Sequence, residues 1–185
     1  MYFMLECLSP FEGHQALINY EPDDLWRNWK KGQKFKEPPT EPVIATIGVE
    51  EGGVMMELFK VPLPLMTKKL ASCLLDAGVA NIDYYQSEID DASSSTIHKN
   101  YFAFNIIGAI AAADLEKSKF SSPDGPMISV DFDSLSINPT KTRNALIFRL
   151  AESVNGIVIH ESVKNAIEAA GIDTLTFIPP EEWVG

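Results

Sequence analysis

The chain has 185 residues, of which 45% are hydrophobic and 22% charged, and its formal net charge is −11. These values are typical of a globular protein with one sizeable core, and they exclude a chain that is disordered throughout. The negative charge argues against nonspecific attraction to nucleic acid or to an anionic membrane.

Other bulk features favour the cytoplasm. The two cysteines do not suggest a disulfide framework, and the first ten residues lack the basic region of a signal peptide. The longest weakly polar run is too short to cross a bilayer. We therefore expect a cytoplasmic protein in a reducing compartment.

The first sixty residues are expected to hold three strands and a short helix. The strands are predicted over residues 2–8, 42–49 and 54–61. The short helix carries Trp26 and Trp29, which stand three residues apart on one face. The prolines in 38–42 mark the only plausible internal boundary. We predict a single domain over residues 1–185, with residues 1–60 as a candidate N-terminal subregion.

A helix, a turn and a strand occur twice, 93 residues apart. Apolar residues recur at the spacing of one helix face in both runs, at Leu70, Cys73, Leu74 and Ala77 and at Val163, Ala166, Ile167 and Ala170. Thr67 is suited to cap the first helix, while Gly78 and Gly171 stand where a helix end favours left-handed backbone. We predict scaffold helices over 67–77 and 161–170, each followed by an internal strand.

The remaining segments predict further strands and a loop. Strands are expected over residues 101–110, 127–132, 145–152 and 156–159, and a polar loop over residues 89–96. Arg149 lies inside an apolar strand, where a charge needs a partner. We expect a structural ion pair with Asp114, with Glu116 and Glu152 as alternatives. Many strands and few helices predict an α+β fold with a mixed, mostly antiparallel sheet and a twice-used helix–turn–strand unit.

The search for reactive groups leaves two alternatives to a binding protein. Asp131 and Asp133 project from one face of a predicted strand, and paired carboxylates suit acid–base or metal chemistry. A small enzyme with a carboxylate site, metal-assisted or not, is therefore one alternative, although a solvated strand end explains the pair better. The other is a nucleic-acid module between Arg27 and Lys36, where five basic residues surround Trp29 and Phe35. We expect instead that the tryptophans pack inward while the lysines stay in water.

Five segments resemble, in their order, a bacterial immunity-protein family long known only as a domain of unknown function. They are MYFMLE, PLPLMTKKLASCLLDAGVANIDYYQSEI, YFAFNIIGAIAAADLEKSKF, LIFRLAE and VIHESVKNAIEAAG. The resemblance covers nearly the whole chain, although His160 stands where a better helix cap is expected. It implies a non-enzymatic protein without cofactors that binds and neutralises a cognate toxin of a polymorphic toxin system, encoded by the adjacent gene.

We expect the toxin to be bound by acidic loops, because the repeated helices use their apolar faces in the core. The first candidate is the segment containing Glu88, Asp90 and Asp91, and the second contains Glu50 and Glu51. Acidic side chains would mainly accelerate association with a basic toxin. The alternative is that both segments are simply solvated turns.

Overall fold

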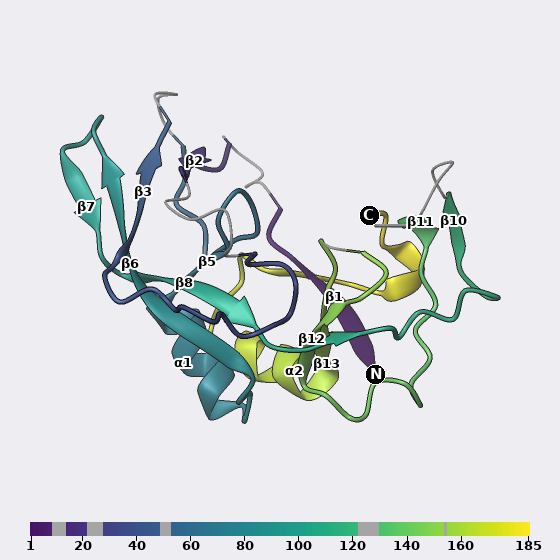
Figure 1. Cartoon of the computed structure of the whole chain (residues 1–185). Helices are drawn as coiled ribbons and strands as arrows, with labels where there is room; N and C mark the ends of the chain where they lie inside the picture. Colours follow the sequence, from purple (N-terminus) through teal and green to yellow (C-terminus); the bar gives the residue numbers. More distant parts are fainter. Residues whose placement is uncertain (9–13, 22–27, 49–52, 122–129, 154) are drawn as a thin grey trace.

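The chain folds into two sheets, a small hairpin and two helices, as seen in a computed structural model that describes residues 1–8, 14–21, 28–48, 53–121, 130–153 and 155–185 (Figure 1). The larger sheet has the order β2-β3-β6-β8-β5-β4, and β7 pairs with β6. Its strands are β2 Ile18–Asn19, β3 Val43–Ile47, β4 Leu58–Phe59, β5 Leu65–Thr67, β6 Ile82–Asp91, β7 Thr96–His98 and β8 Tyr101–Ile106.

The smaller sheet has the order β14-β1-β13-β12-β9. Its strands are β1 Tyr2–Glu6, β9 Ala109–Ile110, β12 Ile147–Leu150, β13 Ile157–His160 and β14 Thr176–Ile178. A separate hairpin and a 3-10 helix are formed by β10 Lys119–Ser121, β11 Asp131–Ser134 and η1 Pro180–Glu182. Only β3–β6 and β9–β12 pair in parallel among the strands described, so the predicted α+β fold with a mixed, mostly antiparallel arrangement is confirmed.

Both helices begin directly after a strand and are capped by its last residue. Helix α1 spans Lys68–Asp76, and the Thr67 hydroxyl accepts a hydrogen bond of 3.2 Å from a backbone N–H of the first turn. Helix α2 spans Glu161–Ala169, and the Nδ1 atom of His160 accepts an equivalent hydrogen bond of 3.2 Å. The histidine that departs from the expected pattern therefore performs the cap's role, because an imidazole nitrogen also satisfies a free N–H at a helix start.

The repeated unit is larger than the helix, turn and strand predicted from the sequence. The strand order β6-β8-β5-β4 of the larger sheet matches β14-β1-β13-β12 of the smaller sheet. The register matches too. Tyr84 lies opposite Phe104 in one copy, and Phe177, which stands 93 residues after Tyr84, lies opposite Leu5 in the other. The intervening strand is β8 in the first copy, where it follows the unit, and β1 in the second, where it comes from the start of the chain. The N-terminal strand thus completes the C-terminal copy.

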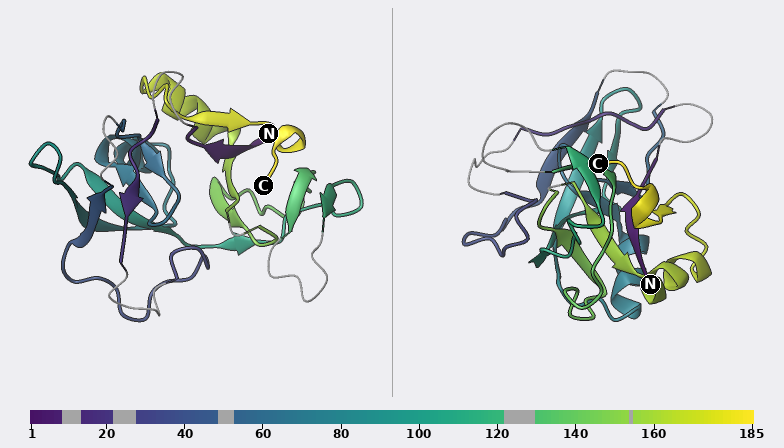
Figure 2. Two further views of the ribbon diagram at one scale, coloured as in Figure 1. Left: turned by 90° about the horizontal axis from the view of Figure 1, so that it is seen from above. Right: turned by 90° about the vertical axis from the view of Figure 1, so that its right-hand side faces the viewer.

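The two copies meet through their helices and share one core. Seen from above, the larger sheet lies on one side of the molecule, and the smaller sheet with both chain ends lies on the other (Figure 2). Leu70 and Leu74 of α1 and Val163 and Ile167 of α2 are buried in one apolar cluster. Gly78 and Gly171 follow the helices with φ of +86° and +66°, which glycine adopts without strain. Scaffold is therefore the role that the repeated helices perform.

Two expectations about the strands after the helices are wrong. The polar loop predicted over residues 89–96 is a hairpin: β6 continues to Asp91, β7 begins at Thr96, and only the residues between them turn. Strand β6 is internal as expected, but β14 is the edge strand of its sheet. Ser87 and Ile89 are buried while the residues between and beyond them are not, so β6 alternates as a half-buried strand does.

Candidate functional site

The predicted acidic segment lies on the outer face of a three-stranded part of the larger sheet, at the end away from the chain termini (Figure 1). On β6, Glu88 pairs across the strand with Ile44 of β3, and Asp90 pairs with Thr46 of β3 and Ile97 of β7. We call these five residues the β3–β6–β7 face. Residues opposite one another in neighbouring strands point to the same side. Two carboxylates and two isoleucines therefore lie on one surface of the sheet.

The three predicted acids of β6 have different surroundings. Glu88 accepts a hydrogen bond from Lys99 at 2.8 Å in an ion pair. Asp91 accepts hydrogen bonds from the hydroxyls of Ser93 and Ser94 at 2.6 Å each, which lower its pKa to about 2 and close the turn. Asp90 is exposed, and its side chain has no partner among the residues whose positions are described. The structure thus brings Glu88 and Asp90 together on one face, while Asp91 stabilises the hairpin turn.

The second predicted acidic segment, with Glu50 and Glu51, lies outside the described residues. It follows β3, the strand that carries Ile44 and Thr46.

The predicted ion pair between Arg149 and Asp114 is not formed. Asp114 pairs instead with Lys117 at 2.9 Å, three residues along the chain, and this contact lowers the pKa of the carboxyl group. The Arg149 side chain is only 3% exposed, its Nε atom has no hydrogen-bond partner among the described residues, and burial lowers its pKa to about 10. Lys117 is within reach of Asp114 in the same turn, whereas the Arg149 guanidinium is held inside a sheet.

Arg149 and Lys60 occupy equivalent positions of the two copies. The registers of β4 with β5 and of β12 with β13 match, which places Lys60 in one copy where Arg149 lies in the other. Lys60 donates to Glu6 at 2.6 Å, and the indole N–H of Trp183 donates to the same carboxylate at 2.9 Å. Burial lowers the pKa of Lys30, and the charges of Arg149 and Lys60 lower it further. Lys30 therefore lies close enough to Arg149 and Lys60 for both charges to disfavour its own.

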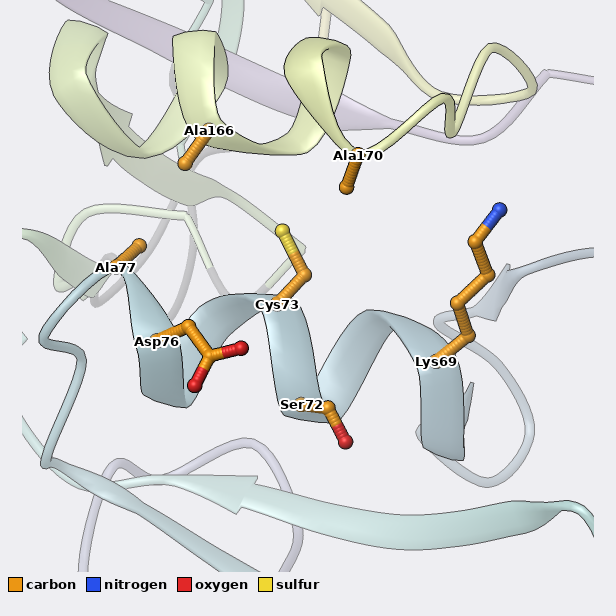
Figure 3. Close-up of a pocket in the computed structure, with 7 residues that line it drawn as sticks. All are labelled: Lys69, Ser72, Cys73, Asp76, Ala77, Ala166 and Ala170. Atoms are coloured by element: carbon orange, nitrogen blue, oxygen red, sulfur yellow. The ribbon is translucent and has the colours of Figure 1, made fainter.

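A groove of about 330 Å³ lies between the two helices (Figure 3). Small side chains line most of it, and the Cys73 thiol points from α1 towards Ala166 of α2 and Ala170, the residue directly after that helix. Burial raises the pKa of Cys73, which keeps it in the unreactive thiol form. Lys69 closes one end by donating to the carbonyl of Gly171 at 3.2 Å. The groove therefore reflects the close approach of two helices through small residues.

The two alternative sites lie at the surface. Asp131 and Asp133 are both exposed on β11, with Phe132 buried between them. Within the described ranges, no three His, Cys, Asp or Glu side chains gather where they could hold a metal ion. In the basic segment Trp29 is buried and packs edge-on against Phe35 and Tyr85, as predicted, with ring centroids 4.8 and 5.7 Å away. Arg27 and Trp26 lie outside the described residues.

Sequence reasoning missed the apolar part of the β3–β6–β7 face. Ile44 and Ile97 are 57% and 51% exposed, although each lies in a strand. The signal was available for Ile44, because Val43 and Ala45 on either side of it are buried and the strand alternates. Ile97 gave no such signal, since it follows a run of serines.

Comparison with known proteins identifies a family. A family model described as "Immunity protein family (Imm11)" matches residues 11–182, nearly the whole chain. A comparison with curated proteins yields no match. In the part of the chain that is described, no helix has the length and apolar character needed to cross a membrane.

Proposed function

The chain belongs to the Imm11 immunity protein family, and we propose that it neutralises a cognate protein toxin by binding it, without catalysing a reaction. The toxin is the product of the adjacent gene in a polymorphic toxin system, and the encounter takes place in the cytoplasm. The family match over residues 11–182 is the observation that carries this proposal.

The architecture supports binding. Two copies of one scaffold unit share a core, and the first copy carries additional strands that hold an exposed surface with carboxylates. Binding residues are commonly displayed on segments that a rigid scaffold positions. A net charge of −11 would also draw a basic partner towards the protein and accelerate its association.

The carboxylate pair on β11 supports catalysis less well. Asp131 and Asp133 stand on an exposed strand face, whereas reacting groups are usually enclosed so that water is excluded and electrostatic interactions are strengthened. We therefore favour neutralisation by binding over a small carboxylate enzyme.

Co-expression tests the proposal. Cells that express the adjacent toxin gene should stop growing, and cells that also express this chain should grow and yield a complex of both proteins. A matched strain with Asp131→Ala and Asp133→Ala should be protected equally, because the pair has no role in binding. Growth arrest in the presence of the wild-type chain would show that the proposal is wrong.

A further inference from the structure

We propose that the β3–β6–β7 face is the surface that contacts the toxin, and that it receives a basic side chain at Asp90 between two apolar contacts at Ile44 and Ile97. This inference rests on the proposed function.

The geometry places the carboxylates between the isoleucines. Asp90 has Ile97 directly across on β7 and Thr46 directly across on β3, while Ile44 lies diagonally from Asp90, directly across from Glu88. Strands lie about 4.8 Å apart, so the two isoleucines flank β6 with about 10 Å between their strands. A lysine or arginine side chain fits this width, with its charged end at a carboxylate and its aliphatic stem against the isoleucines.

The two isoleucines lie on the exposed side of the sheet. Ala45, the residue after Ile44 on β3, and Ile89 of β6 point to the opposite side, which packs into a core, and they are 2% and 0% exposed. Leu17, which precedes β2 and whose carbonyl accepts the backbone N–H of Gly48, is a further exposed apolar residue at 53%. Apolar side chains that gather on one face favour a partner surface more than scattered ones do.

Asp90 is the charge available to a partner. Lys99 already neutralises Glu88, and the serine hydroxyls already surround Asp91. Asp90 remains exposed without a partner among the residues that the structure describes. A cation that reaches Asp90 between two apolar contacts is partly shielded from water, which strengthens the pair relative to one in open solvent.

Comparison of the two copies shows that this surface lies outside the repeated unit. Strand β14 ends at Ile178, the equivalent of Tyr85, whereas β6 continues to Asp91 and gains β3 and β7 as neighbours. The second copy has no such extension among the described strands, and its β14 is an edge. Residues that the scaffold does not need are free to serve recognition.

The charge of the face selects the class of partner. An unpaired carboxylate repels the phosphates of nucleic acid and of anionic lipids. It attracts a protein surface that presents lysine or arginine, and the isoleucines match the apolar contacts that such a surface offers. The occupant we propose is therefore a basic patch of the toxin that also carries apolar residues.

Binding kinetics with the purified toxin domain test the inference. Asp90→Lys should slow association roughly tenfold at low salt, with a smaller effect at high salt. Ile97→Ala and Ile44→Ala should each weaken affinity about tenfold, mainly through faster dissociation. Matched controls are Asp173→Lys after α2 and Leu75→Ala on α1, which is 55% exposed. Both controls should bind within about twofold of wild type, a change smaller than a typical contact residue produces.

Each outcome has a separate meaning. If the wild type binds the toxin and the three face variants bind equally well with unchanged unfolding midpoints, the toxin contacts another surface and the inference is wrong while the proposed function stands. If the wild type itself neither binds nor protects, the proposed function fails and the inference fails with it. All three substitutions are at exposed positions, and Asp90→Asn provides a second variant that removes the charge without reversing it.

Discussion

Arg149→Met should raise the free energy of unfolding, although it removes a large side chain from β12. The guanidinium is 3% exposed and has no ion pair in the described part of the chain, and burial lowers its pKa to about 10. Lowering a pKa by one unit corresponds to ~1.36 kcal/mol of destabilisation of the charged form, so keeping this charge buried costs about 3 kcal/mol. Methionine fills a similar volume without a charge, and some of the gain is offset by imperfect packing. We expect a net stabilisation of about 1–3 kcal/mol.

Lys60→Met is the matched control, because Lys60 occupies the equivalent position of the other copy. Lys60 is paired with Glu6, so its removal leaves a half-buried carboxylate with the Trp183 N–H as its remaining partner among the described side chains. This variant should lose about 1–3 kcal/mol. Equivalent substitutions at equivalent positions should therefore change stability in opposite directions.

Urea unfolding followed by tryptophan fluorescence and circular dichroism measures both variants, with the free energy extrapolated to water. A single transition with an unchanged slope shows that the fold is retained. If Arg149→Met is less stable than wild type by more than 1 kcal/mol, the guanidinium has a stabilising partner and the reasoning from its burial is refuted.

Three further predictions concern the helices and two titrating groups. Leu74→Ala or Ile167→Ala should lower the free energy of unfolding by about 2–5 kcal/mol in urea, and wild-type stability would show that these helices are not packed as described. Burial raises the pKa of Tyr84 to about 12, so the folded state retains a proton that the unfolded state loses, and stability should fall from pH 10 towards 12. Tyr84→Phe should reduce that fall in unfolding curves across this range, and an equal fall in both proteins would contradict the assignment. The pKa of Asp91 is lowered to about 2, so its stabilisation is present above about pH 4 and is lost as the pH falls towards 2. Asp91→Asn should lack this acid-dependent step in thermal melts, whereas an identical pH profile would show that the turn does not depend on the carboxylate.

The sequence predicts the helices of the repeat well and its other strands poorly. Two runs with the same apolar stripe and a glycine at the same offset define the ends of α1 and α2 to within one residue. The equivalence of β1 with β8 and of β4 with β12 depends on strands of two to six residues, which carry too little periodicity to be matched. The order of strands in a sheet depends on pairing between segments that are far apart in the sequence. Local residue preferences do not determine that pairing.

The acidic segment shows how a local turn signal can hide a strand. The serines that follow Asp91 indicate a turn, and this signal outweighed the alternation of Ser87 and Ile89 with Glu88 and Asp90. The sequence therefore predicts a loop where β6 continues to Asp91. The burial of Arg149 without an ion pair in the described part of the chain was beyond prediction, because it depends on which elements the tertiary fold places beside β12.

Titration of the toxin's activity with the purified chain tests neutralisation by binding most directly. The account predicts that residual activity falls in proportion to the amount of chain added, reaches zero at a fixed molar ratio, and does not change when the mixture is incubated longer. Complete inactivation by a small fraction of one equivalent, increasing with time, would show that the chain acts as a catalyst. Full toxin activity in the presence of excess chain would contradict the account altogether.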